Sequence, residues 1–233
     1  LTSEMPESMK SDFCITHFFN PVRFMRLLEI VKTPEFDETK MDGLLDFCQK
    51  ELGKGIVICN DTPGFIGNRI GVYAMQVAMY EALDRGLPVE IADALFGRPL
   101  GIPKTGVFGL YDLIGIDLMK DVLASFKKEL QPEDPFMDVV KPHPVVEALL
   151  DKGYTGNKGP GGFYETKIVD GEEIVKALNV SDMSYYDFDK VDLPVARRVE
   201  KEGMKALLND DSDYGRYAFA VFAKIINYSA FCV

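Results

Sequence analysis

The sequence is poor in the residues that form disulfides and metal sites. Among 233 residues there are four cysteines and two histidines, and no two cysteines have a Cys-x-x-Cys spacing. Each cysteine lies in an apolar context, which is typical of a buried thiol in a reducing compartment. We therefore expect a cytoplasmic protein with no disulfide bond and no bound metal.

The sequence also lacks an excess of positive charge and lacks long apolar runs. Its formal net charge is −11, whereas a nucleic-acid partner requires Lys and Arg to neutralise phosphates. No apolar run approaches the length of a membrane helix, and no signal peptide is visible. These absences argue against nucleic-acid and membrane partners. They leave open a small anionic ligand, because a local basic pocket can override the net charge.

The chain is long and apolar enough, at 47% hydrophobic residues, for one large domain or two small ones. The first part reads as a strand–strand–helix–strand unit. Thr33 is the expected N-cap of its helix and Gly53 the expected end. The expected strands are 13–19, 26–31 and 55–59, and the expected helix is 33–53. Three strands are few for a stable sheet, which suggests a sheet continued by residues that this chain lacks.

The rest of the chain is predicted to be mainly helical. Residues 65–86 are apolar nearly all round, so this helix should be buried in a core or a subunit interface. Residues 166–193 combine charge with few apolar residues and are interpreted as a linker. The Tyr-containing stretches "MYEA" (79–82) and "NYSA" (227–230) match in type, which indicates a weak repeat. The other expected helices are 89–97, 106–115, 116–130, 143–153, 194–209 and a last one that closes the chain.

A histidine and a glutamate stand alone in two apolar runs. His17 lies in the first expected strand and Glu29 in the second, twelve residues later. If the strands pair antiparallel around Arg23, His17 lies opposite Glu29, about 5 Å away at Cβ. A buried carboxylate beside an imidazole holds it in one tautomer and stabilises its protonated form, as a general base requires. The alternative is an ordinary structural histidine in a core strand.

Two motifs carry a family resemblance. "HFFNPVRFMRLLEIV" (17–31) followed by "NDTPGFIGNRI" (60–70) resembles the 3-hydroxyacyl-CoA dehydrogenases of fatty-acid β-oxidation. Three further blocks occur in the family's order and spacing, so that the resemblance covers residues 13–165. These blocks are "YEALDRG" (80–86), "GRPLGIPKTGVFGLYDLIGID" (97–117) and "GYTGNKGPGGFYE" (153–165).

The resemblance implies a fold, a reaction and three site residues. Residues 1–62 would be the last strands and helix of a truncated α/β Rossmann domain that binds NAD, and 63–165 the helical C-terminal domain. Residues 194–233 would begin a second helical repeat, as in longer multifunctional members. His17 would take the proton of the 3-hydroxyl group of an acyl-CoA substrate while NAD accepts the hydride. Glu29 would orient His17, Asn68 would contact the substrate, and a homodimer could form through the helical domain.

The sequence departs from the family in what it lacks. It has no G-x-G-x-x-G turn between a strand and a helix, so the NAD site is expected upstream of residue 1. We therefore expect the 233-residue chain alone to be inactive. Arg98, Lys104 and Lys158 are candidate contacts for CoA phosphates, and His143 is expected to be a turn residue. Two alternatives remain: a helical assembly module with an inert dyad, and a dehydrogenase of a non-CoA hydroxy acid.

Overall fold

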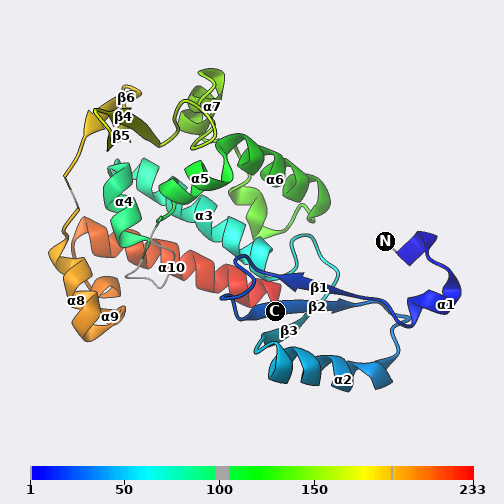
Figure 1. Cartoon of the computed structure of the whole chain (residues 1–233). Coiled ribbons are helices and arrows are strands. Elements are labelled where there is room, and N and C mark those ends of the chain that lie inside the picture. Colours follow the sequence, from blue (N-terminus) through cyan, green and yellow to red (C-terminus); the bar gives the residue numbers. More distant parts are fainter. Residues whose placement is uncertain (1, 98–104, 190) are drawn as a thin grey trace. The chain divides into compact units, whose positions relative to one another are not determined.

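The computed structural model describes residues 2–97, 105–189 and 191–233. The chain forms two compact units, Leu1–Arg69 and Ile70–Val233. Figure 1 shows the strands β1–β3 in the first unit and most of the helices in the second. No helix in the described ranges is both long enough and apolar enough to cross a membrane.

The first unit is built around a three-stranded sheet of order β1-β2-β3. Strand β1 pairs antiparallel with β2, and β2 pairs parallel with β3. The expected strand–strand–helix–strand order is therefore confirmed. The described elements of this unit are η1 (Thr2–Glu4), α1 (Glu7–Lys10), β1 (Cys14–Phe18), β2 (Leu27–Lys32), η2 (Glu38–Lys40), α2 (Met41–Asp46), the π-helical turn η3 (Phe47–Glu51) and β3 (Gly55–Cys59).

The helix between β2 and β3 begins later than the sequence predicted. Thr33 is not its N-cap, because the backbone turns at 33–36 before the helical stretch starts. The cap is Asp37, whose carboxylate accepts a hydrogen bond from the Thr39 backbone N–H at 3.0 Å. Asp is as good an N-cap as Thr, and the earlier Thr-Pro pair forms a turn instead.

The two faces of this sheet carry different chemistry. Leu28 and Ile30 of β2 are fully buried in a cluster with Met41 and Cys48 from the helical segment. Because side chains alternate along a strand, Glu29 points to the opposite face. The predicted register is confirmed, since His17 pairs with Glu29 and Ile15 with Val31. The apolar face thus secures the sheet, while the other face is left for the polar pair.

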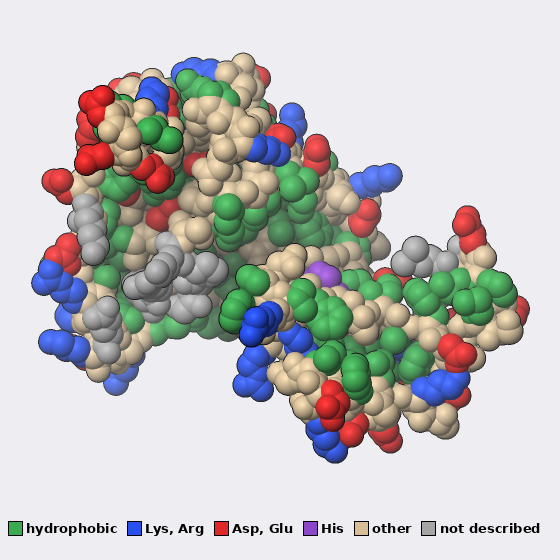
Figure 2. All heavy atoms as spheres, in the orientation of Figure 1, with side chains coloured by type: hydrophobic (Ala, Val, Ile, Leu, Met, Phe, Trp, Pro, Cys, Tyr) green, Lys and Arg blue, Asp and Glu red, His purple; other side chains and the backbone are tan. Residues whose placement is uncertain are grey.

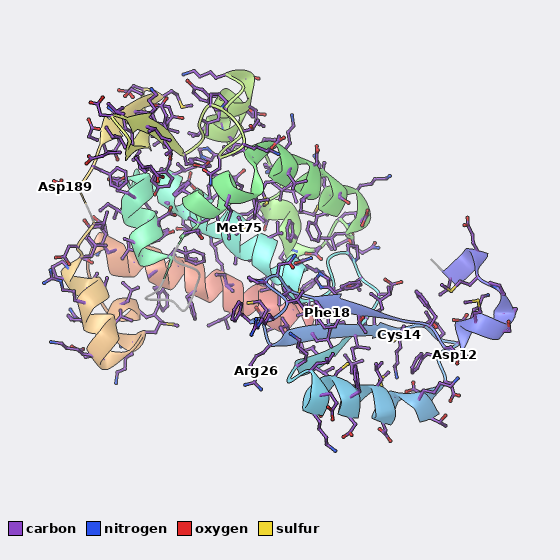
Figure 3. The ribbon with its side chains drawn as sticks, in the orientation of Figure 1. Asp12, Cys14, Phe18, Arg26, Met75 and Asp189 are labelled. Carbon is purple, nitrogen blue, oxygen red and sulfur yellow. The ribbon has the colours of Figure 1, made fainter. Side chains whose placement is uncertain are left out.

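The second unit is a helical core with a small sheet. Helix α3 is buried on successive residues 75–79, as expected for a helix that is apolar nearly all round. Its described helices are α3 (Gly67–Asp84), whose first turn belongs to the first unit, α4 (Val89–Leu95), α5 (Phe108–Ile114), α6 (Ile116–Glu129), η5 (Pro135–Asp138), α7 (Pro144–Asp151), α8 (Pro194–Glu202), α9 (Lys205–Leu208) and α10 (Asp213–Cys232). In Figure 3, Met75 marks the middle of α3.

Helices α3 and α10 pack against each other inside this one unit. They carry the two stretches of the weak repeat, 79–82 and 227–230. The rings of Tyr73 and Tyr228 stack with centroids 4.0 Å apart. The Tyr217 hydroxyl donates to the Ala78 carbonyl at 3.2 Å, and both residues are fully buried. Residues 194–233 therefore belong to the same compact unit as residues 70–165. A second helical repeat remains a prediction.

The interpretation of residues 166–193 as a linker is wrong for most of that range. Strands β4 (Tyr164–Val169), β5 (Glu172–Asn179) and β6 (Ser184–Asp187) form an antiparallel sheet. Asp170 and Gly171 connect β4 to β5 with positive φ angles of 54° and 84°. Asp-Gly between two strands is a strong hairpin pattern, but the many charges on the two strands weaken their apolar alternation. The sheet is anchored by Ala177 and Leu178, which are almost fully buried.

Two carboxylates, the buried Asp112 and the partly buried Asp93, fasten this sheet to the helices. Asp112 of α5 accepts hydrogen bonds from the backbone N–H groups of Phe163 and Tyr164 at 2.9 and 2.7 Å. Asp93 of α4 accepts the Tyr164 hydroxyl at 2.8 Å and the N–H group of Phe108 at 2.7 Å. Burial raises the pKa of each carboxyl to about 7, although the hydrogen bonds oppose the shift.

We expect this pKa shift to make the stability of the second unit depend on pH. Because the folded-state pKa of Asp112 is raised to about 7, its contribution is present at low pH and is lost as the pH rises through about 7. The free energy of unfolding should fall by about 2 kcal/mol for each of the two carboxyls, Asp93 and Asp112, between about pH 5.5 and 7.5. In Asp112→Asn the fall should be smaller. Urea unfolding at several pH values measures it, with the exposed Asp121→Asn as control. Equal slopes in all three proteins would contradict the expectation.

Candidate active site

His17 and Glu29 form a hydrogen-bonded pair on the face of the sheet opposite α2. His17 Nδ1 lies 2.7 Å from Glu29 Oε2. The glutamate side chain is 1% exposed, whereas the histidine side chain is 29% exposed. A carboxylate accepts only, so Nδ1 carries the proton and Nε2 is left as the basic nitrogen. The predicted pair is therefore assembled with its acid buried and its base open to solvent.

The second oxygen of Glu29 is held by the start of α3. Glu29 Oε1 accepts the backbone N–H groups of Ile66 at 3.0 Å and Gly67 at 2.6 Å. These N–H groups belong to the first turn of a helix, where they have no partner within the helix. The positive end of the helix dipole also favours a negative charge there. Glu29 is thus fixed at both oxygens, one by the helix and one by His17.

A turn with strained backbone delivers these N–H groups. Gly64 and Phe65 both have positive φ angles, 72° and 50°. A left-handed conformation is easy for Gly but costs energy for Phe. In this conformation the centroid of the Phe65 ring lies 5.7 Å from that of the His17 ring. The Phe19 ring packs edge-on against His17, with ring centroids 4.7 Å apart. The imidazole is therefore held by two aromatic rings as well as by Glu29.

Cys59, at the end of β3, also faces Glu29. Its Sγ lies 3.7 Å from Glu29 Oε1 and is buried. Burial and the adjacent carboxylate raise the pKa of the thiol to about 11, so it stays protonated and can donate a weak hydrogen bond. This contact agrees with the expectation of a buried, unreactive cysteine.

The loop that follows β1 is held by a buried lysine. Lys54 Nζ donates to the carbonyl oxygens of Val22 and Met25 at 2.5 and 2.7 Å. The ammonium also lies 5.7 Å from the centre of the Phe18 ring. Figure 3 labels Phe18 and Arg26 at the two ends of this connection. Lys54 thereby fixes the loop next to the end of the strand that carries His17.

Asn68 follows directly after the N–H groups that bind Glu29. Its side chain is exposed, and it makes no hydrogen bond in the described ranges. The backbone N–H groups of Ile66 and Gly67 are not open to a ligand, because they donate to the carboxylate of Glu29. Asn68 itself remains available to a ligand.

The candidate contacts for CoA phosphates and the expected turn residue His143 have three different outcomes. Arg98 and Lys104 lie outside the described residues. Lys158 forms an ion pair with Asp117 at 2.7 Å, with both side chains about half exposed. His143 is the N-cap of α7, where its Nδ1 accepts the Val145 N–H at 3.2 Å, which refines the expected turn residue. Among the described residues, no group of three His, Cys, Asp or Glu side chains could hold a metal ion.

Sequence reasoning missed four contributors to the site. These are the N–H groups of Ile66 and Gly67, the left-handed Phe65, and Lys54. Main-chain N–H groups leave no mark on the sequence beyond the Pro-Gly pair that begins the turn. A positive φ at Phe65 cannot be read from Phe at all. Only the lone Lys before the apolar strand "GIVIC" could have indicated a buried cation.

We expect Gly67→Ala to disturb the site and the matched Gly71→Ala to leave it intact. A Cβ at Gly67 would overlap the Phe19 ring tip and lie 3.4 Å from Glu29 Oε1, whereas a Cβ at Gly71 meets nothing within 4 Å. The first variant should lose about 1–2 kcal/mol of unfolding free energy, and the second should gain about 0.5–1 kcal/mol as Ala replaces a helical Gly. Because the chain has two histidines, imidazole ¹⁵N resonances report His17 directly. A His17 resonance unchanged in Gly67→Ala would contradict this prediction.

Charged side chains of both signs are interspersed over the face shown in Figure 2. That face carries no continuous patch of Lys and Arg. The picture agrees with the net charge of −11.

Comparison with known proteins identifies two matching segments. Residues 64–166 match the family description "3-hydroxyacyl-CoA dehydrogenase, C-terminal domain", and residues 1–62 match "3-hydroxyacyl-CoA dehydrogenase, NAD binding domain". The putative fatty acid oxidation complex trifunctional enzyme of Rickettsia prowazekii is 37% identical over 97% of this chain and 30% of its own length. The mitochondrial hydroxyacyl-coenzyme A dehydrogenase of Mus musculus is 39% identical over 66% of this chain and 48% of its own.

A solved structure agrees. The crystal structure of 3-hydroxybutyryl-CoA dehydrogenase from Escherichia coli K12 matches with a TM-score of 0.52 and 29% identity, over 66% of this chain and 32% of that one. The chain spans about a third of the length of the Rickettsia relative and about half of the mouse one. The two matched segments meet within the turn that fixes Glu29.

Proposed function

Since the chain belongs to the 3-hydroxyacyl-CoA dehydrogenase family, we propose that it carries the catalytic base of an NAD-dependent (3S)-3-hydroxyacyl-CoA dehydrogenase of fatty-acid β-oxidation. The observation that supports this most is the His17–Glu29 pair, in which one imidazole nitrogen is bound to a buried carboxylate and the other has no hydrogen-bond partner among the described residues. In the proposed reaction His17 Nε2 takes the proton from the substrate 3-hydroxyl group. Glu29 keeps the imidazole in the required tautomer and balances the charge that develops on it.

NAD would accept the hydride from C3 of the substrate. Residues 1–62 match the family's NAD-binding domain, but their strands are not followed by a glycine-rich turn and a helix. Such a turn is what binds the dinucleotide pyrophosphate. We therefore propose that most of the NAD site lies outside residues 1–62. We also propose that the 233-residue chain alone does not catalyse the reaction. A measured rate of NAD reduction by this chain with a 3-hydroxyacyl-CoA would refute that part.

Asn68 is proposed to contact the substrate near the reacting carbon. Its amide is exposed, lacks a partner in the described ranges, and is one residue from the N–H group of Gly67 that binds Glu29. Asn68→Ala should lower kcat/KM by about tenfold, because it removes the free energy of one hydrogen bond to the substrate. Unfolding free energy should change by less than about 0.5 kcal/mol, because the side chain is exposed. A normal kcat/KM would remove Asn68 from the site.

The first test is NADH oxidation by the proposed full-length enzyme with acetoacetyl-CoA. A parallel reaction with free acetoacetate decides whether the CoA portion is required. Turnover of the CoA thioester alone supports the proposal. Turnover of the free acid at a similar kcat/KM supports instead a dehydrogenase of non-CoA hydroxy acids. No turnover of either would leave the family resemblance as a likeness of fold.

A helical assembly module remains the second candidate, because one observation favours it. Helix α10 exposes three large apolar side chains, Phe219, Ile226 and Phe231, each more than half exposed. Helix α3, the expected pairing helix, is instead packed on α10 of its own chain through Tyr73 and Tyr228. As this second candidate, we propose a homodimer that forms through the exposed apolar side chains of α10. Sedimentation of the protein with and without Phe219→Glu tests it, and a wild-type monomer would count against it.

A further inference from the structure

The second unit contains a cavity that has no part in the proposed reaction. It has a volume of about 470 Å³ and is lined by residues of α3, α5, α6, α7 and the connection before α7. This volume falls within the range of about 300–1,000 Å³ typical of small-molecule sites. All the residues that line it belong to the second unit, between positions 76 and 151. The cavity is therefore a property of that unit alone, separate from the His17–Glu29 pair.

The inside of the cavity is apolar and its polar floor is satisfied. The walls come from α3, α6 and α7, and they include Met79, Met119 and Leu123. On the floor, Gln76 Nε2 donates to the Val139 carbonyl at 2.6 Å, and the Tyr111 hydroxyl donates to Gln76 Oε1. Each of these side-chain polar atoms thus already has a hydrogen-bond partner within the protein. A group that enters the cavity should therefore be apolar, such as an alkyl chain.

The rim of the cavity has the opposite character. Lys120 and Lys127 stand two turns apart on α6, and Lys141 lies on the connection that leads to α7. All three are exposed, and none forms an ion pair within the described part of the chain. Two acidic residues, Glu147 and Asp151 of α7, also line the cavity. Three lysines against these two carboxylates leave the lining residues with a net charge of +1, in a chain whose net charge is −11.

His143 adds a neutral donor to this rim. Its Nδ1 accepts the Val145 N–H, so the proton of the neutral ring is on Nε2. Its ring packs edge-on against Tyr80, with centroids 5.2 Å apart. An imidazole fixed in this way can donate one hydrogen bond from a defined position. The rim therefore offers cations and a donor, which is the combination that binds a carboxylate.

We propose that this cavity binds an unbranched alkyl chain with a terminal carboxylate, that is, a medium-chain fatty acid. The alkyl chain occupies the apolar interior, and the carboxylate lies at the rim among the three lysines and His143. The cationic rim distinguishes such a ligand from a neutral alkane or alcohol of the same length. The proposal rests on the cavity and does not require the dehydrogenase activity to be correct.

Methionine methyl groups give a direct test with decanoate as the probe. Met79 and Met119 line the cavity and are almost fully buried, while Met41 lies in the first unit. In protein labelled with [methyl-¹³C]methionine, decanoate should shift the Met79 and Met119 resonances in a saturable way and leave Met41 unchanged. Met79→Leu and Met119→Leu assign the two signals. No shift, or shifts spread over methionines of both units, would overturn the proposal.

The head group is tested with ligand and protein variants. The double variant Lys120→Gln/Lys127→Gln should weaken decanoate binding at least about fivefold, through loss of two charge-assisted contacts. Lys128→Gln, the next residue on α6 but not a lining residue, is the matched control and should bind normally. Decanol should bind more weakly than decanoate and equally to all three proteins. Equal affinity for acid and alcohol would overturn the assignment of a carboxylate.

Two further arms separate this site from the proposed substrate site. His17→Gln should bind decanoate as the wild type does, because His17 belongs to the other unit. Decanoyl-CoA should not shift Met79 and Met119 more strongly than decanoate does. If decanoyl-CoA alone shifts them, the free fatty acid is the wrong ligand. Failure of the dehydrogenase assay would leave the result of the methionine experiment unaffected.

Discussion

His17→Gln is expected to lower kcat of the proposed full-length dehydrogenase by about 10²–10⁴-fold, with KM for acetoacetyl-CoA changed by less than about threefold. Glutamine can still donate a hydrogen bond to Glu29 Oε2, so the local structure should be retained. What it cannot do is accept the proton of the substrate hydroxyl group, since an amide is not a base. The loss should therefore appear in kcat and not in substrate binding.

The control for His17→Gln lies on the same strand. Thr16 is exposed and points to the other face of the sheet, opposite Ile30. Thr16→Val should leave kcat within a factor of about two, because its side chain makes no contact with the pair. Circular dichroism and urea unfolding of both variants establish that the fold is intact. A His17→Gln enzyme with normal kcat would show that the pair is structural and that another group removes the proton.

The sequence alone was sufficient for the pair itself. An antiparallel pairing of the two strands centred on Arg23 predicts that His17 and Glu29 are directly opposite. The structure has this register. Alternation along β2 then places Glu29 on the face away from Leu28 and Ile30. Periodicity of two is a strong constraint, because a slip by one residue would bury the wrong side chains. Local pattern therefore predicted which polar groups meet.

What the sequence could not supply is the support that comes from the main chain and from distant segments. The N–H groups that fix Glu29 come from residues 37 and 38 positions later, and their direction depends on two positive φ angles. Backbone direction at Phe65 follows from tertiary packing against His17, not from any preference of Phe. The missed sheet at 164–187 has a different cause. Its strands are largely exposed and charged, so their apolar alternation is weak.

Glu29→Gln is expected to inactivate the proposed enzyme without unfolding it, by reversing the hydrogen bond to His17. The amide oxygen can still accept the N–H groups of Ile66 and Gly67, so the amide nitrogen must face His17 Nδ1. An amide nitrogen donates, which forces Nδ1 to accept and moves the imidazole proton to Nε2. The nitrogen that should take the substrate proton is then already protonated. We expect kcat to fall by about 10³–10⁴-fold, as for other carboxylate-to-amide changes beside a catalytic His.

The tautomer itself is the decisive readout for Glu29→Gln. With two histidines in the chain, ¹⁵N imidazole spectra can assign the protonated nitrogen of His17, which should be Nδ1 in the wild type and Nε2 in the variant. Glu29→Ala should differ, because it leaves two partly buried N–H groups, those of Ile66 and Gly67, without an acceptor and should cost about 2–4 kcal/mol of unfolding free energy. Glu51→Gln, at an exposed position of the same unit, is the control. An inactive Glu29→Gln enzyme with the wild-type tautomer would mean that Glu29 acts through its charge. An active variant would mean that orientation of His17 does not limit the rate.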